Sequence, residues 1–225
     1  MYKNNKIAYY DYSIETTVTN AAGETQSSTN VIPATSSSMV LQAKLNEKNS
    51  KDKPILVEIM LQNLNKHLIE AKGTYRLFHA KNKELKEVKG EPVETGTFTT
   101  NRELTFDWKH LPSGPYILKL EAKDNRGNEV TAETGTIIFS TTDIRPPVES
   151  PVWFYEENTE FDAIHPAKFY FGTSEKDVYV MMNIFCGDRL LDRKKMYISD
   201  TIVPFDYPYE KSYGNGLSIN FCMVR

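Results

Sequence analysis

The residues of this chain that could do chemistry are few, and their spacing forms no catalytic or metal-binding pattern. The four histidines are His67, His79, His110 and His165. None lies two or four positions from another histidine or from a cysteine, so the spacing of a metal-ligand cluster is missing. No Gly-x-Ser-x-Gly segment occurs, which removes the nucleophile elbow of a hydrolase. The sequence therefore predicts no catalytic residue, no metal site, no cofactor and no enzyme activity.

One group of oxygen-bearing side chains is close enough in sequence to bind calcium. It consists of Asp124, Asn125, Asn128 and Glu129. Calcium takes such carboxylate and amide oxygens as ligands. A hairpin turn uses the same residue types for its backbone, so we predict a turn here and keep calcium as the alternative.

The two cysteines are too few for a disulfide framework. Strand side chains alternate between two faces, and Cys186 continues the apolar face of Val178 and Ile184. Cys222 falls on the face opposite Phe221. We predict two free thiols, one in the core and one outside.

Two tryptophans could stack on sugars in a carbohydrate-binding module. Trp108, however, shares its strand face with Leu104 and Phe106, which predicts burial in a core. Trp153 lies in a short segment that is apolar on both faces, which indicates a contact between domains or between sheets.

Composition excludes several partners. The formal net charge is -3 with both signs interspersed, which gives no basic surface for nucleic acid and no polybasic patch for a membrane. No run approaches the roughly 20 apolar residues of a membrane helix. Aromatic residues make up 12% of the chain and favour β structure. We expect no nucleic-acid partner and no direct membrane insertion.

The clearest structural signal is the stretch from Leu111 to Glu129. Its residues predict a turn, a strand, a second turn and the start of a second strand. Its apolar residues fall on one strand face, namely Tyr116, Leu118, Leu120 and Ala122, and its other face carries Ile117, Lys119, Glu121 and Lys123. A tyrosine directly after a corner is typical of immunoglobulin-like sandwiches, where its hydroxyl fastens the corner.

The same pattern occurs earlier in the chain at a constant distance. The matching pairs are Tyr12 with Tyr116, Ile14 with Leu118, Thr16 with Leu120, Val18 with Ala122, Asn20 with Asp124, and Gly23 with Gly127. Each pair is separated by 104 positions, the difference between 12 and 116. A distance near 100 is a domain length, so we predict consecutive modules of one kind.

We therefore predict an all-β chain of tandem immunoglobulin/fibronectin III-like β-sandwich domains. Residues 1–34 are expected to be the C-terminal hairpin of a preceding sandwich, with its earlier strands upstream of Met1 and a short polar linker at Pro33–Ser38. Residues 35–142 are expected to form a complete seven-stranded domain. A Pro-rich linker covers residues 143–151, and residues 152–225 form a third sandwich that is possibly truncated.

The strands expected in the two larger units are short and alternating. In the second unit they lie around residues 39–45, 55–61, 75–77, 93–100, 104–108, 116–123 and 129–139, with a turn at 49–53 and a charged loop at 81–89. In the third unit they lie at 152–155, 167–171, 178–186, 190–198, 202–205 and 217–224.

Several of these segments resemble the macroglobulin domains of bacterial alpha-2-macroglobulin-like proteins of the Bacteroidetes kind. The segments are 12–24, 116–129, 171–174 before 177–180, 159–169, 202–210 and 217–225. His165-Pro166-Ala167 departs from the usual Pro-Gly, and the family's Cys-Gly-Glu-Gln thioester segment is absent. The resemblance implies a non-catalytic scaffold fragment, leading toward the bait region, of a broad-spectrum protease trap in the periplasm or at the cell surface.

The resemblance implies two kinds of partner. They are the neighbouring domains of the same polypeptide and the proteases that the full-length parent binds. Three other interpretations stay open. The sandwiches could be spacers of a surface adhesin or stalk, or a carbohydrate-binding module. A sandwich-built enzyme would need a site that the sequence does not display.

Overall fold

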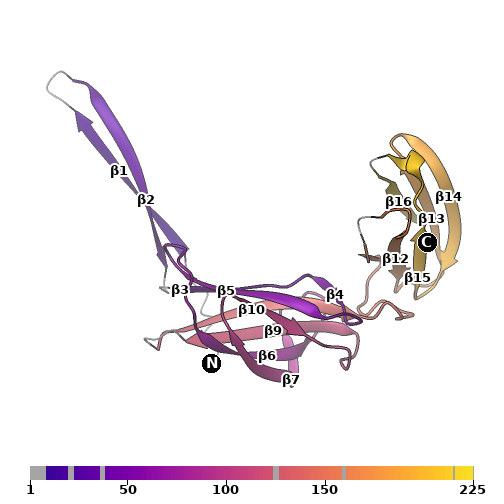
Figure 1. The fold of residues 1–225 in the computed structure, drawn as a ribbon, viewed down its shortest axis with the longest axis horizontal. Coiled ribbons are helices and arrows are strands. Elements are labelled where there is room, and N and C mark those ends of the chain that lie inside the picture. Colours follow the sequence, from indigo (N-terminus) through magenta and orange to yellow (C-terminus); the bar gives the residue numbers. More distant parts are fainter. Residues whose placement is uncertain are drawn as a thin grey trace.

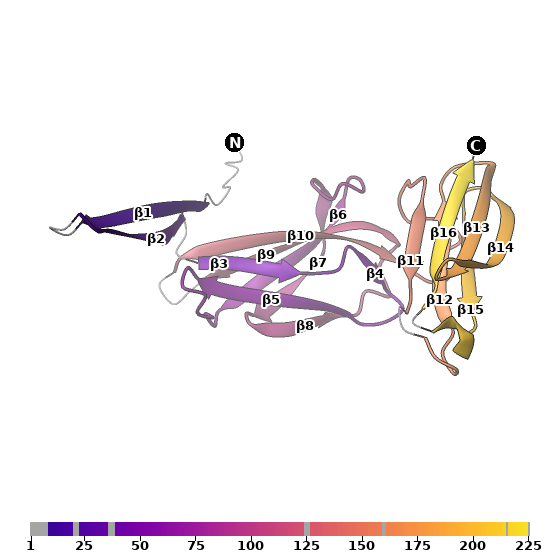
Figure 2. The same ribbon diagram turned by 90° about the horizontal axis from the view of Figure 1, so that it is seen from above.

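The chain is almost entirely β structure, as the sequence predicts. A computed structural model describes residues 9–19, 23–35, 39–123, 127–158, 161–214 and 216–224. They form a two-stranded hairpin (residues 9–35), a middle domain (residues 39–142) and a third domain (residues 152–224). Figures 1 and 2 show the hairpin projecting from one end of the middle domain and the third domain at the other end.

The hairpin consists of β1 (Tyr9–Thr19) and β2 (Thr25–Thr35), paired antiparallel along their whole length. Its apolar side chains are exposed: Tyr12 is 60% exposed and Val18 is 64% exposed. Tyr12 therefore matches Tyr116 in strand pattern but not in burial, because no second sheet among the described residues covers this face. The turn residues 20–22 lie outside the described part.

The predicted polar linker at Pro33–Ser38 is wrong in its first half, because β2 continues through Thr35. Pro33 lies opposite Asp11 in the ladder. Proline is tolerated on an edge strand, where its missing N–H can face away from the partner, and β2 has β1 as its one partner among the described strands. Residues 36–38 lie outside the described part.

The middle domain packs two sheets face to face. One sheet has the order β4-β10-β9-β6-β7 and the other has the order β3-β5-β8. Their bounds are β3 Met39–Lys44, β4 Lys48–Ser50, β5 Ile55–Asn63, β6 Lys72–Ala80, β7 Val88–Thr99, β8 Arg102–Phe106, β9 Gly114–Lys123 and β10 Glu129–Phe139.

The prediction of seven strands misses β4, which lies where a turn is expected. This three-residue strand pairs parallel with the end of β10, Lys48 opposite Ile137 and Ser50 opposite Phe139. Its partner is so distant in sequence that no local pattern indicates the pairing. The middle domain therefore has one more strand than predicted.

The core of the middle domain follows from alternation along the strands. In β5 the side chains of Ile55, Val57, Ile59 and Leu61 are buried while those between them are exposed. Trp108 is fully buried and stacks on Phe106 with ring centroids 4.5 Å apart. This confirms that Trp108 belongs to the core and removes it as a sugar platform.

Tyr116 lies at the start of β9 and forms the predicted corner. Its side chain is completely buried, and its hydroxyl donates to the carbonyl oxygen of Pro112 at 2.8 Å. Burial raises the pKa of the Tyr116 hydroxyl to about 12, because the charged phenolate would lose its hydration. The hydroxyl is therefore held as a neutral donor.

The outer face of β9 differs from the prediction at one position. Ile117 is completely buried, although the alternation places it with exposed lysines. Its ladder partner is Gly135, and Leu85 from the predicted charged loop lies directly over that glycine. The loop folds back onto the sheet, closed by an ion pair of 2.6 Å between Lys81 and Glu87.

The third domain consists of two three-stranded sheets, β11-β12-β15 and β14-β13-β16. The bounds are β11 Trp153–Glu156, β12 Ala167–Thr173, β13 Val178–Cys186, β14 Arg189–Ile198, β15 Thr201–Tyr207 and β16 Ser218–Val224, with a short 3-10 helix at Lys211–Tyr213. Each strand lies where the sequence predicts it. The inner faces meet in a core that includes Phe169, Phe171, Val180, Met182 and Ile184.

Candidate functional site

The structure does not bring the four histidines together. His79 lies against the ring of Tyr116, His110 is 3.7 Å from a carboxylate oxygen of Glu94, and His165 is 3.1 Å from one of Asp162. His67 lies in the loop after β5. Within the described ranges, no three His, Cys, Asp or Glu side chains are grouped as a metal site would require.

The calcium alternative falls partly outside the described residues, since 124–126 are not among them. Of its remaining members, Glu129 forms an ion pair with Lys123 across the β9–β10 ladder. The Glu129 carboxylate is therefore already engaged by a cation of the same hairpin.

The two cysteines are free thiols on different surfaces. Cys222 is exposed on β16, as predicted for the outer thiol. The prediction that Cys186 lies in the core is wrong: it is half-buried, because a register shift between Ile184 and Phe185 interrupts the alternation just before it. Its sulfur lies 3.5 Å from the carbonyl oxygen of Tyr213.

The most distinctive arrangement lies where the middle domain contacts the third domain. Trp153 of β11 is 1% exposed and packs edge to face on Phe139 of β10, with ring centroids 5.4 Å apart. Tyr155 meets the same Phe139 ring at 4.5 Å, also edge to face. Ile137, Val148 and Ile202 complete this apolar cluster. Of the two contacts that the sequence left open for Trp153, between domains or between sheets, the structure shows the one between domains.

Lys48 of the missed strand β4 bridges the two domains. Its Nζ donates to the carbonyl oxygen of Phe154 at 2.7 Å and lies 4.5 Å from the centre of the Trp153 ring. A cation over an aromatic face is attracted by the ring electrons. Burial lowers the pKa of the Lys48 ammonium below its usual 10.5, although the charge of Glu47 opposes this shift.

Asp52 fastens the last residues of the middle domain, which lead into the Pro-rich linker. Its carboxylate accepts the backbone N–H of Thr141 at 2.6 Å, the Thr141 hydroxyl at 2.7 Å and the Ser140 hydroxyl at 2.9 Å. Burial raises the pKa of the Asp52 carboxyl, but these hydrogen bonds and one from Ser50 outweigh it and hold the pKa below 3.8.

The linker is also bound to the third domain. The carbonyl oxygen of Ile144 accepts the backbone N–H of Ile202 at 2.8 Å and the Thr201 hydroxyl at 3.1 Å. Beside it, Arg145 pairs with Asp200 at 3.2 Å. These bonds attach the linker to the third domain, so the aromatic cluster is not the one contact that holds the third domain in place.

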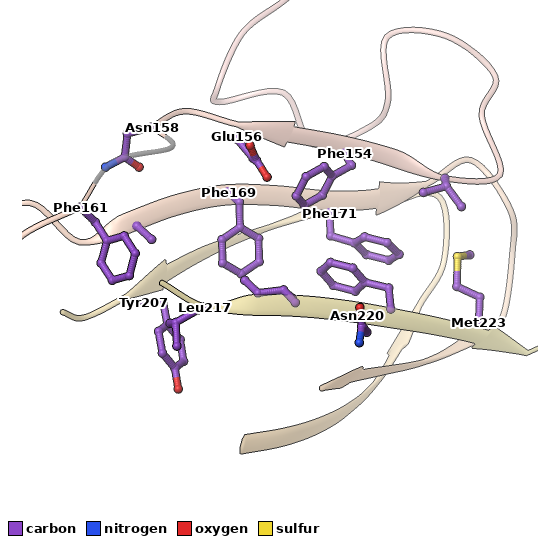
Figure 3. A pocket seen from close by; sticks show the side chains of 14 residues that line it. Phe154, Glu156, Asn158, Phe161, Phe169, Phe171, Tyr207, Leu217, Asn220 and Met223 are labelled. Atoms are coloured by element: carbon purple, nitrogen blue, oxygen red, sulfur yellow. The ribbon is translucent and has the colours of Figure 1, made fainter. Parts of the chain in front are cut away.

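The third domain has a second notable feature, an apolar groove of about 510 Å³ between its two sheets. Figure 3 shows Phe154, Phe169 and Phe171 pointing into this space from β11 and β12, with β16 forming the opposite wall. Phe221 of β16 stacks on Phe171 with centroids 4.0 Å apart. Most of the side chains that line the groove are apolar, so it can bind apolar side chains. Its polar members include Glu156, Asn158 and Asn220.

The fold and these contacts define the class of protein as a chain of tandem immunoglobulin-like β-sandwich domains. No model of a known protein family matches the sequence, and no curated protein matches it. In the described residues, no helix has the length and apolar character needed to cross a bilayer.

Similar solved structures include a tetra-tandem repeat from the extending region of a large adhesion protein, at 14% identity and a TM-score of 0.32. The match covers 94% of this chain and 52% of that one. Red sea bream transglutaminase is similar at 9% identity and a TM-score of 0.33, over 83% of this chain and 29% of that one. The chain thus spans about half the length of the first structure and less than a third of the second.

Proposed function

We propose that this chain is a non-catalytic scaffold whose middle and third domains act as one stiff body. The observation that carries the proposal is the cluster of Phe139, Trp153 and Tyr155, in which aromatic rings from both domains interlock. Interfaces between domains of one chain are small by default and allow relative motion. A buried aromatic cluster with a bridging Lys48 opposes that motion.

Three sets of contacts act at the junction between the middle and third domains, which we call the joint. Together they support a stiff connection rather than a flexible one. The aromatic cluster resists separation, Asp52 holds the residues that lead into the linker, and Ile144 joins the linker to the third domain. A joint held at separate points resists bending as well as extension. This is what a spacer or a load-transmitting scaffold requires.

Rotational diffusion tests this proposal, because backbone amide relaxation reports the tumbling of each domain. In the natural chain we expect one common correlation time for the middle and third domains. Trp153→Ala removes the central ring and should give the third domain a shorter correlation time. Tyr197→Ala is the matched control, since it removes an aromatic ring that is 79% exposed in the same domain. Independent tumbling in the natural chain would refute the stiff scaffold.

As a more specific role, we propose that the scaffold belongs to a protease trap of the alpha-2-macroglobulin type in an extracytoplasmic compartment. The resemblance supports this through segments that fall on β12, β15 and β16 of the third domain. In such a trap, cleavage elsewhere in the parent releases strain across joints like the one at Trp153. A spacer of an adhesin or stalk would use the same stiffness without any change of shape.

Limited proteolysis of the full-length parent separates these two roles. A trap should change its sedimentation or native mobility when cut and should retain the protease. A spacer should be cut with no such change. If the parent shows neither a shape change nor a retained protease, the trap role is wrong while the stiff scaffold stands.

A further inference from the structure

We propose that the outer face of the sheet β14-β13-β16 binds an anionic saccharide, such as an oligomer of uronic acid. This binding site goes beyond the scaffold role, because it gives the third domain a ligand. In Figures 1 and 2 the sheet lies on the side of the third domain that is remote from the middle domain. A strand that paired with β16 would lie beside this face and would not cover it.

The register of the three strands places the outward side chains in rows. Val180, Met182 and Ile184 of β13 are buried between the sheets, so the residues that alternate with them point outward. Pairing with β14 and β16 gives these outward residues a neighbour on each side. The first row is Tyr197, Tyr179 and Val224, the second is Lys195, Met181 and Cys222, and the third is Arg193, Asn183 and Asn220.

Two tyrosines give this face an aromatic platform. The Tyr197 side chain is 79% exposed, and its ring meets that of Tyr179 edge to face, with centroids 5.1 Å apart. A tyrosine offers an apolar ring for stacking and a hydroxyl for hydrogen bonding, which suits the mixed surface of a sugar. Tyr197 belongs to neither core cluster of the third domain, so packing does not require an aromatic ring there.

Arg193 is oriented for the carboxylate of a ligand. Its Nε donates to the Oδ1 of Asn183 at 2.7 Å, which positions the guanidinium and leaves its two Nη groups for another acceptor. The guanidinium fork matches a carboxylate, which it binds through two hydrogen bonds. Within the described part of the chain, neither Arg193 nor Lys195 forms an ion pair.

Other arginines of the chain differ from Arg193 in this respect. Three of them pair with a carboxylate of the chain itself, namely Arg76, Arg102 and Arg145. Arg193 is instead held by a neutral amide, so its charge is positioned without being neutralised. This is the arrangement that recognition of an anion requires.

Charge complementarity favours an anionic saccharide over other ligands. The three rows contain Arg193 and Lys195 but no acidic residue, whereas the whole chain has a formal net charge of -3. Two cations are few for a nucleic acid, whose binding depends on neutralising several phosphates. An apolar protein surface would desolvate both cations without pairing them. The strand from Arg193 to Tyr197 spans about 13 Å, which accommodates a short oligosaccharide.

Isothermal titration calorimetry of the natural chain with short oligomers of galacturonate, alginate and hyaluronan tests the proposal. We expect at least one of them to bind, and added salt should weaken the binding because the cations are exposed. The matched neutral oligomer of galactose should bind less tightly, since it has no carboxylate for Arg193. A chain that binds none of the anionic oligomers would overturn the proposal.

Variants then locate the site. Arg193→Gln and Lys195→Gln should each raise the dissociation constant about tenfold. Lys168→Gln is the matched control and should leave it unchanged, because Lys168 is exposed on β12 of the opposite sheet. Tyr197→Ala should also weaken binding, and Tyr12→Ala is its control, since that ring is 60% exposed on the hairpin. Equal effects of a variant and its control would place the ligand elsewhere and overturn the proposal.

Amide chemical shifts and a second probe separate a saccharide site from a general anion surface. In a titration with the tightest oligomer, the shifts should concentrate on the outward residues of β13, β14 and β16. Single-stranded DNA is the second probe, and it should bind more weakly than the saccharide. If it binds as tightly and loses the same affinity in Arg193→Gln, the face is a non-specific anion surface and the saccharide is the wrong ligand.

Discussion

The hydroxyl of Tyr116 donates to the carbonyl oxygen of Pro112, four residues earlier, and so closes the corner from which β9 begins. Tyr116→Phe keeps the buried ring and removes only this bond. We expect a loss of about 1 kcal/mol in the free energy of unfolding, the usual net contribution of one hydrogen bond. Urea denaturation measures it.

Tyr197→Phe is the control for this experiment, because the Tyr197 side chain is 79% exposed. The control should cost less than Tyr116→Phe, since water already solvates the Tyr197 hydroxyl. Equal losses in both variants would contradict a special role for the corner.

Gly135 is expected to tolerate no side chain. A Cβ at this position would lie 2.5 Å from the Cβ of Leu85, an atom close to the backbone that cannot rotate away. Gly135→Ala should therefore destabilise the middle domain by about 1–3 kcal/mol, the usual cost of overpacking. Thermal unfolding and urea denaturation measure the change.

The companion substitution Leu85→Gly tests the cause of that loss. Leu85 has a φ of 54°, which glycine adopts without steric cost. The double variant should lose less than the sum of the two single losses, because the clash is gone. Simple additivity would show that Leu85 is not the obstacle.

Asp52 should make the joint sensitive to acid. Its folded pKa lies below the unfolded value near 3.8, so its contribution to stability is complete above that value. The contribution is lost as pH falls below 3.8 through the folded pKa. Asp52→Asn should lower stability near neutral pH and flatten the pH dependence below 3.8. Urea denaturation across this pH range measures the free energy of unfolding of both chains. If it falls equally steeply with pH in the natural chain and in Asp52→Asn, the role given to Asp52 is wrong.

Calcium should leave the melting temperature unchanged. Glu129 is already paired with Lys123, and a metal that binds only the folded form must raise stability. Differential scanning calorimetry with calcium and with a chelator checks this expectation. A rise in melting temperature with calcium, abolished in Glu129→Gln, would establish the alternative at the β9–β10 turn.

Most strands could be predicted from sequence because each carries its own alternation. β5 and β13 bury every second side chain, and that pattern is visible without knowledge of the partner strand. The same reasoning placed Trp108 in the core and Trp153 at a contact. It also predicted the class of fold, which the structure confirms, because strand pattern and turn residues are local properties.

The remainder depends on contacts between distant segments. β4 has only three residues and pairs with β10, so nothing nearby indicates it. Lys48 begins β4 and Asp52 lies two residues beyond its end. A lysine beside an expected turn and an aspartate within it give no signal of their roles. Tyr12 shows the reverse case, since alternation indicates a strand but not whether another sheet covers it.

The bonds that Ile144 makes to Ile202 and Thr201 also shorten the free tether between the domains. A short tether keeps the third domain close to the middle domain and so gives its contact surface a high effective concentration there. Three aromatic rings would hold two separate proteins only weakly, but on this tether they need not pay the entropy of a bimolecular encounter. The length of the linker therefore determines the stability of the joint as much as the rings do. Residues added to the linker would weaken the contact between the domains without replacing any residue that forms it.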